Sequence, residues 1–189
     1  MRYYRYRPDA DKFAGIGAPM ADNERVVDIH FDDTPLTCSW RTVQFHGFGN
    51  DREMENGDFP SLSNYWSIPV FSQRAWDVLH RRIECCWEAL PIVHPSGNPF
   101  YIIHVMETID CVNIGRSEVA RYSDGRVMEV ERYCLQLEKI KDKHVFKLPL
   151  KSGTNLLVDD VFREAVEKNA LRGLLFRELP MVDEGGEAG

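Results

Sequence analysis

The sequence predicts an α+β fold: a mainly antiparallel sheet, arranged as hairpins in a meander, with about two main helices packed on it. Two segments have apolar residues at helical spacing, several short runs are rich in β-branched and aromatic residues, and short turn signals separate those runs. A chain of 189 residues with 43% apolar residues can bury a sizeable core. We expect one globular domain over residues 1–180 and a disordered Gly- and Glu-rich tail over residues 181–189.

The first third of the chain predicts three strands separated by loops that contain Pro, Gly and Asp. These strands are Arg2–Arg7, Arg25–Phe31 and Trp40–Phe45. In the second strand every other residue is apolar, from Val27 to Phe31, which is typical of a half-buried antiparallel strand. The following segment, residues 47–67, is rich in turn formers and predicts a long irregular loop.

The first helix is expected over Gln73–Ile83, where the apolar residues fall on one face. Ser72 is expected to be the N-cap, because its hydroxyl can accept a hydrogen bond from an otherwise unpaired backbone N–H. Phe71 and Trp76 flank this cap at the spacing of a hydrophobic staple. The sequence therefore predicts both where this helix begins and how the chain enters it.

Two hairpins follow. Trp87–Val93 and Phe100–Met106 are apolar runs separated by a turn segment, and Glu118–Tyr122 and Val127–Leu137 flank an Asp-Gly turn. Because consecutive hairpins commonly join, we expect one antiparallel meander.

The second helix is expected over Asp160–Lys168, with Asp159 as its N-cap. Its inward face is predicted to consist of Val161, Phe162, Ala165 and Val166. Glu164 and Lys168 lie four residues apart and should form an ion pair on the outer face. The run Leu174–Leu179 then predicts a short final strand.

Charge and composition exclude several classes of function. The net charge of −7 argues against non-specific binding to nucleic acid and suits a basic partner. No segment approaches the about 20 apolar residues that cross a bilayer, and the first residues do not resemble a secretory signal. Five cysteines without disulfide spacing predict reduced, mostly buried thiols. We therefore expect a cytoplasmic protein that binds neither nucleic acid nor membranes.

The sequence carries no specific signal for chemistry. Cys85 and Cys86 lie between His80 and His94, but structural zinc needs four ligands that usually come in short-spaced pairs, so a core role is favoured. A cysteine nucleophile needs a base, and nothing in the sequence selects one pair among five cysteines and six histidines. Nucleophile-elbow, zinc-protease and phosphate-loop motifs are absent from the sequence. We expect no catalytic residue, no metal and no cofactor.

Two charged segments are candidates for contact with a partner. The acidic residues of the long loop are either an ordinary solvated loop or a docking surface for a basic partner, and they are Asp51, Glu53, Glu55 and Asp58. Tyr65 and Trp66 in the same loop are candidate interface anchors, although a core role stays open for both. The arginines and glutamates of residues 116–132 predict ordinary cross-strand pairing.

Several segments occur in an order that resembles a known family. They are Asp58–Leu62, Pro69–Leu79, Ser117–Arg121, Asp124–Arg126, Glu131–Tyr133, Phe146–Pro149, Leu157–Phe162 and Leu171–Leu174. This series resembles the bacterial immunity protein eleven family, formerly a domain of unknown function, and the resemblance covers residues 58–176. Its motif residues read as structural, and they are Phe59, Pro60, Phe71, Ser72, Trp76, Ser117, Glu118, Arg121, Asp124, Gly125, Tyr133 and Asp159.

The resemblance implies an immunity protein of a polymorphic toxin system. Such a protein is expected to bind a cognate toxin domain in the cytoplasm and to neutralise it by occluding the active site, without catalysis of its own. Homo-oligomerisation stays open. Two alternatives also stay open: a hydrolase or transferase that uses Cys, His and carboxylates, and a housekeeping interaction protein without a toxin partner.

Overall fold

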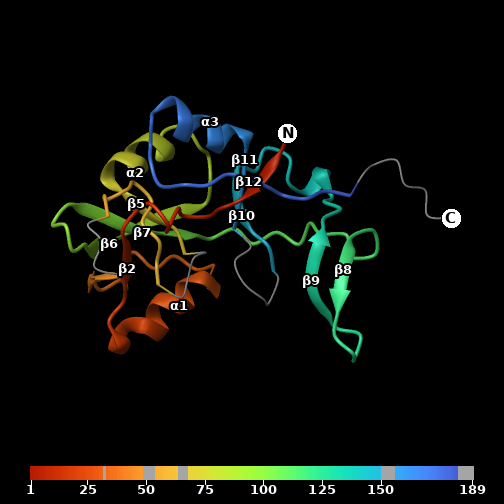
Figure 1. Ribbon diagram of the computed structural model, residues 1–189, viewed down its shortest axis with the longest axis horizontal. Coiled ribbons are helices and arrows are strands. Elements are labelled where there is room, and N and C mark those ends of the chain that lie inside the picture. Colours follow the sequence, from red (N-terminus) through yellow and green to blue (C-terminus); the bar gives the residue numbers. More distant parts are fainter. Residues whose placement is uncertain (32, 49–53, 64–67, 150–155, 183–189) are drawn as a thin grey trace.

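The computed structural model describes residues 1–31, 33–48, 54–63, 68–149 and 156–182. These residues contain three α-helices and many short strands that pair mostly antiparallel, so the predicted α+β class is confirmed (Figure 1). The predicted disordered tail lies almost entirely outside the described residues.

One four-stranded sheet contains the first predicted hairpin. Its order is β3-β6-β7-β5, formed by Val43–Gln44, Trp87–Val93, Pro99–Val105 and Val70–Ser72. β6 and β7 pair antiparallel over their whole length, as predicted, whereas β3 pairs with β6 in parallel. The predicted strand Trp40–Phe45 is thus present but shorter.

A second four-stranded sheet brings together segments that are far apart in the sequence. Its order is β10-β11-β1-β12, formed by Val145–Lys147, Leu156–Asp159, Tyr3–Arg5 and Arg177–Glu178. β1 lies between β11 and β12 and pairs antiparallel with both. The predicted strands at residues 2–7 and 174–179 are confirmed, each over fewer residues.

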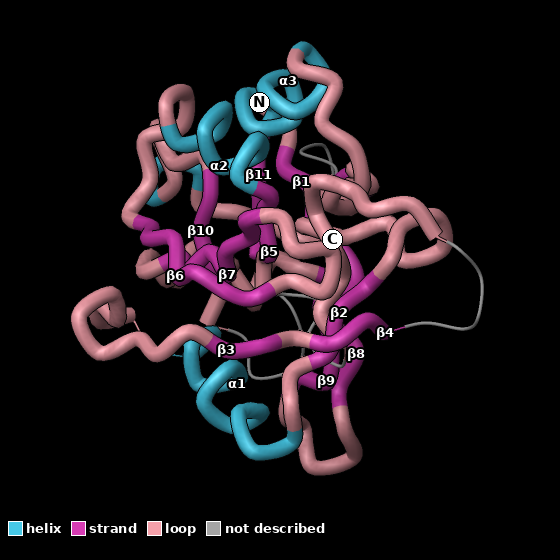
Figure 2. The backbone as a smooth tube through the Cα atoms, turned by 90° about the vertical axis from the view of Figure 1, so that its left-hand side faces the viewer, coloured by secondary structure: helices cyan, strands magenta, loops and turns pink. Residues whose placement is uncertain are grey.

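Helices α2 (Gln73–His80) and α3 (Asp160–Lys168) pack side by side on one side of the sheets (Figures 1 and 2). Both predicted caps are confirmed: Ser72 accepts a hydrogen bond from the backbone of Ala75, and Asp159 accepts one from Phe162. The predicted inward position of Val161 is wrong, since its side chain is 37% exposed while the other three predicted residues are buried.

Helix α1 (Asn23–Phe31) replaces the strand predicted for Arg25–Phe31. Val26 and Ile29, three positions apart, are both buried, whereas Val27 is half-buried. This spacing follows the helical period, and the apolar core beneath the β3-β6-β7-β5 sheet overrides the β-propensity of the segment. Figure 2 shows α1 on the side of the molecule opposite α2 and α3.

Two smaller sheets complete the fold. β2 (Gly15–Gly17) pairs with β4 (His46–Phe48), and β8 (Glu118–Arg121) pairs with β9 (Val127–Arg132). The β8–β9 hairpin was predicted, but the single meander is wrong, because this hairpin is not hydrogen-bonded to the sheet that contains β6 and β7. In Figure 1 the hairpin projects from the lower edge of the molecule.

Three hydrophobic clusters form the core. One lies beneath α2 and α3, a second between α1 and the β3-β6-β7-β5 sheet, and a third where the second sheet meets the β8–β9 hairpin. All five cysteines are free thiols. The expectation that most of them are buried is wrong: Cys111 is buried, whereas Cys38 and Cys86 are exposed.

Candidate functional site

The acidic loop is described only in part. Asp51, Glu53, Tyr65 and Trp66 lie outside the described residues. Glu55 is exposed, and its carboxylate lies 2.9 Å from the guanidinium of Arg172. Asp58, in contrast, is only 9% exposed, so the expectation of an exposed carboxylate is wrong at this position.

Asp58 connects three segments of the chain. Its carboxylate accepts hydrogen bonds from the Ser72 hydroxyl at 2.7 Å and from the backbone N–H of Arg172 at 2.9 Å, and Arg74 lies 3.4 Å away. A buried carboxylate with these partners fixes the start of α2 against the segment that follows α3. Its contacts are those of a structural residue.

The other motif residues also lie in the body of the fold or in the projecting hairpin. Phe59, Pro60 and Phe71 are buried, and Trp76 stacks on His80 with ring centroids 4.7 Å apart. The Ser117 hydroxyl donates to the Asn113 carbonyl at 2.7 Å and accepts from the backbone of Cys134 at 3.0 Å.

A cavity of about 450 Å³ opens beside Tyr133, and we call it the Tyr133 hollow. Its apolar lining includes Tyr3, Tyr133, Leu135, Leu137, Leu179 and Met181, and its charged lining is Arg2, Arg116, Glu138 and Glu178. These residues come from β1, from the loop before β8, from the segment after β9 and from the region of β12. Sequence reasoning missed this site because no single segment contains it.

Tyr133 is held by hydrogen bonds at its backbone and at its hydroxyl. Its backbone N–H donates to the Pro180 carbonyl at 2.8 Å, and its own carbonyl accepts from Val182 at 3.0 Å. Arg5 donates to the Tyr133 hydroxyl at 3.0 Å, and the Arg5 guanidinium carbon lies 5.6 Å from the centre of the Tyr133 ring. Because Tyr133 is only 2% exposed, it forms a fixed wall of the hollow.

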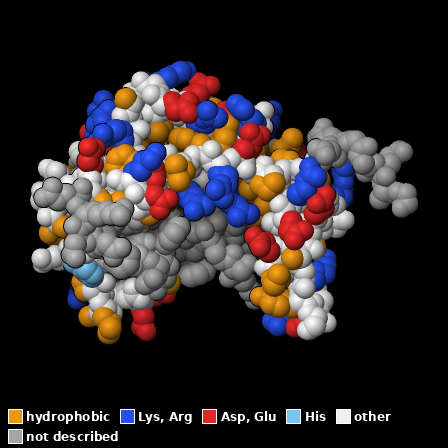
Figure 3. All heavy atoms as spheres, viewed as in Figure 1, with side chains coloured by type: hydrophobic (Ala, Val, Ile, Leu, Met, Phe, Trp, Pro, Cys, Tyr) orange, Lys and Arg blue, Asp and Glu red, His pale blue; other side chains and the backbone are white. Residues whose placement is uncertain are grey.

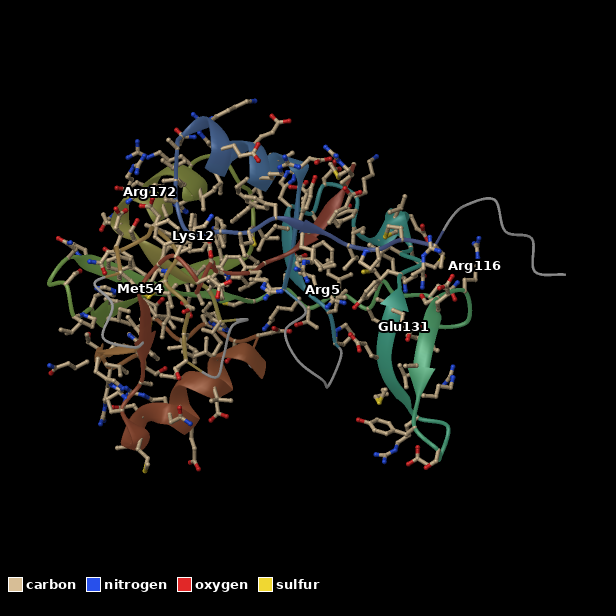
Figure 4. All side chains as sticks on the ribbon, in the orientation of Figure 1. Arg5, Lys12, Met54, Arg116, Glu131 and Arg172 are labelled. Carbon is tan, nitrogen blue, oxygen red and sulfur yellow. The ribbon has the colours of Figure 1, made fainter. Side chains whose placement is uncertain are left out.

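Two arginines of the second sheet are neighbours of residues that line the hollow: Arg5 donates to Tyr133, and Arg177 precedes Glu178. Arg5 and Arg177 lie directly opposite each other where β1 pairs with β12. Figure 3 shows basic side chains gathered in the centre of this face, and Figure 4 labels Arg5 there and Arg116 farther right. Arg2 lies 3.4 Å from Asp160 and 3.9 Å from Glu178. The backbone N–H of Arg2 donates to Asp160 and is the main cause that lowers the pKa of this carboxyl.

The β8–β9 hairpin projects next to the hollow. Its register shifts twice, so that Glu131 and Met128 are the extra residues of two β-bulges on β9. Glu118 lies opposite Arg132 with their charged groups 3.7 Å apart, which confirms the predicted cross-strand pairing at this position. Figure 3 shows hydrophobic, acidic and basic side chains interleaved over this hairpin.

The tip of the hairpin is fixed by internal contacts. Arg126 pairs with Asp124 at 2.7 Å and lies over the ring of Tyr122 at 5.6 Å, while Arg121 donates to the Gly125 carbonyl at 2.9 Å. Gly125 has a φ of 85°, a conformation that favours glycine. Tyr122 is 50% exposed at this ordered tip.

Cys85 and Cys111 have raised pKa values, which argue against either thiol as a nucleophile. Burial is the largest cause that raises the pKa of Cys85 to about 12, and burial also raises the pKa of Cys111 to about 11. Both thiols are therefore protonated at neutral pH and are poor nucleophiles. Within the described part of the chain, no three His, Cys, Asp or Glu residues gather as a metal site would require.

The comparison with protein families gives a match that includes the β8–β9 hairpin. Residues 92–180 match the Imm11 immunity protein family. The predicted resemblance is confirmed over that range, and the Imm11 match starts later than the expected residue 58. No curated protein was found to match the chain.

The Imm11 match covers much of the candidate site. It spans the β8–β9 hairpin and the parts of the Tyr133 hollow contributed by residues 116–138 and 178–179. Arg2 and Tyr3, at the start of β1, line the hollow from outside the match. Among the described residues, no helix is long and apolar enough to cross a membrane.

Proposed function

We propose that this protein is an Imm11 immunity protein that binds and neutralises a cognate toxin domain of a bacterial polymorphic toxin system. The observation that carries the proposal is the Imm11 match over residues 92–180. A protein that protects the cell which makes the toxin must meet the toxin inside that cell, so we propose that it acts in the cytoplasm.

The proposed docking face combines the Tyr133 hollow with the β8–β9 hairpin. Protein interfaces commonly have apolar pockets and exposed aromatic anchors near their centre, surrounded by polar groups. The hollow supplies the apolar pocket, and Tyr122 and Met128, which is 41% exposed, supply the projecting side chains. Because internal contacts already hold the hairpin tip, little conformational entropy is lost when it binds.

The proposed mechanism is occlusion by stoichiometric binding, not catalysis. A typical stable complex buries about 800 Å² on each partner, which is enough to cover the mouth of an active site. A projecting hairpin can enter a cleft that a flat surface cannot reach. The raised pKa values of Cys85 and Cys111 argue against a reaction that uses either of these two thiols as the nucleophile.

The experiment is growth rescue combined with co-purification. Cells that express the toxin domain encoded beside this gene should grow when this protein is co-expressed, and the two proteins should co-purify at a fixed ratio. A matched pair of variants locates the surface: Tyr122→Ala should weaken the complex at least tenfold, whereas Met20→Ala, at a residue just before α1 that is 95% exposed, should not. Rescue without a complex would contradict neutralisation by direct binding.

A further inference from the structure

The pairing of β1 with β12 places two arginines opposite each other. Arg5 and Arg177 are direct cross-strand partners, and like charges in that position destabilise an antiparallel pair. Arg5 directs its guanidinium to Tyr133. Arg177 is exposed, and its side chain forms no ion pair with a residue that the structure describes.

Two arginines elsewhere on this protein, Arg163 and Arg126, lie beside carboxylates. Arg163 lies 2.7 Å from Glu167, and Arg126 lies 2.7 Å from Asp124. The Arg5–Arg177 pair differs from these two, because the residue opposite each arginine carries the same charge. Places where a local rule is broken without a compensating contact are often functional sites, where a binding partner supplies the missing interaction.

The charged residues that line the Tyr133 hollow balance, with Arg2 and Arg116 against Glu138 and Glu178. Arg5 and Arg177 on the adjacent β1–β12 pair make the surroundings positive, although the chain carries a net charge of −7. Arg5 and Arg177 lie on one side, and Arg116 lines the hollow on another side without an ion pair to the described residues. Of the two carboxylates in the lining, Glu178 lies 3.9 Å from Arg2, which leaves Glu138 as the remaining acidic group. A positive patch on an acidic protein attracts an acidic partner surface.

The apolar lining adds a second requirement for the partner. Leu137 is 51% exposed and Met181 is 36% exposed, and both line the hollow. An apolar side chain inserted between them would bury surface that is now in contact with water. The hollow thus fits an apolar side chain that has carboxylates next to it.

We propose that the toxin domain docks here through an acidic segment. Its carboxylates face Arg5, Arg177 and Arg116, and an apolar side chain between these carboxylates enters the Tyr133 hollow. This inference rests on the proposed immunity function and names the chemistry of the partner. It reverses the expectation from net charge alone, which favoured a basic partner.

The test is a charge reversal with a matched control. Arg177→Glu and Arg82→Glu both replace an exposed arginine, and Arg82 follows α2, away from the hollow. With the purified toxin domain encoded beside this gene as the probe, Arg177→Glu should lower the association rate about tenfold at low salt and flatten its salt dependence. Arg82→Glu should change the rate less than twofold.

Thermal unfolding of the free protein separates a binding role from a structural role. Because Arg177→Glu removes the like-charge pairing with Arg5, its melting temperature should rise or stay unchanged while binding weakens. A purely structural Arg177 would show the opposite, with lower stability and an unchanged association rate, and that result would overturn the inference.

A second pair of variants tests the apolar contact. Leu137→Asp should weaken the complex at least tenfold, whereas Met20→Asp should not. If wild-type protein forms a complex that neither Arg177→Glu nor Leu137→Asp weakens, the acidic-segment inference is wrong and the proposed function stands. If the wild-type protein forms no complex and rescues no cells, the proposed function and the acidic-segment inference are both wrong.

Discussion

Individual buried polar residues hold loops to the sheets. His94, for example, stacks on Phe100 with ring centroids 4.0 Å apart, and its Nδ1 accepts a hydrogen bond from the backbone of Ser96 at 3.1 Å. A ring nitrogen that accepts a hydrogen bond carries no proton, so these contacts require neutral histidine. Burial accordingly lowers the pKa of His94 to about 4.

This shift makes stability depend on pH. His94 has a folded pKa below its unfolded value of about 6.5, so its contribution is fully present above pH 6.5 and is lost as the pH falls toward 4. We expect the free energy of unfolding to fall by on the order of 1 kcal/mol between pH 7.5 and pH 5 through this group. Urea unfolding at both pH values measures it, and His94→Gln should show a smaller decrease. Equal decreases in both proteins would contradict the assignment.

Local residues were predictable from sequence, whereas residues with distant partners were not. Ser72 and Asp159 each accept a hydrogen bond from a backbone N–H only three residues later, so the local sequence pattern identifies both as caps. Asp58 looks like one of several loop carboxylates, but its partner Arg172 is 114 positions away in the sequence. The Tyr133 hollow could not be predicted for the same reason, because its lining residues are far apart in the sequence.

Helices and strands were likewise predictable only where the local sequence decides their structure. The α2 and α3 predictions succeeded because the cap and the apolar spacing agree within each segment. The α1 prediction failed because Arg25–Phe31 is rich in β-branched residues, and its helix depends on the core beneath the sheet. The hairpin β8–β9 was predictable from its Asp-Gly turn, but its two bulges were not, because bulges depend on register.

The α3 cap gives a prediction at this scale. Asp159 is fully buried, accepts the backbone N–H of Phe162 at 3.0 Å and lies 2.8 Å from His144. Asp159→Ala should lower the free energy of unfolding by about 2 kcal/mol, since it removes the cap and the partner of His144. Glu164→Ala removes an exposed ion pair in the same helix and should cost only about 0.3 kcal/mol. Chemical denaturation measures both, and similar losses would refute the capping role.

At the scale of the whole molecule, one carboxylate on β6 is among the groups that attach the loop after α1 to the sheet. Glu88 on β6 accepts hydrogen bonds from the backbone of Leu36 at 2.5 Å and of Thr37 at 3.1 Å, and it also accepts one from His104 at 2.9 Å. Burial by itself would raise the pKa of Glu88, but the bonds from His104 and the loop outweigh burial and lower the pKa. The charged carboxylate therefore holds the loop.

Removal of this charge should loosen one part of the protein selectively. Glu88→Gln should speed amide hydrogen exchange in residues 33–42 about tenfold, because one charge-assisted hydrogen bond contributes about 1.5–3 kcal/mol. Exchange in α2 and α3 should stay unchanged. Glu84→Gln, at an exposed position just before β6, is the control and should alter neither region. Mass spectrometry of peptides from both regions measures the effect, and uniform acceleration would contradict a local attachment.

Because β1 lies between β11 and β12, it cannot pair in its sheet until the C-terminal part of the chain has been synthesised. Arg2 is bonded to Asp160, 158 positions later, and β1 also pairs with β12 beyond that point. A ribosome that adds about 5–20 residues per second needs on the order of 10–30 s to cover that separation. During that interval β1 has neither of its neighbours, so a nascent chain lacks the Arg5–Arg177 edge of the proposed docking face. Under the proposed immunity function, protection therefore depends on molecules whose synthesis is complete before the toxin domain is present.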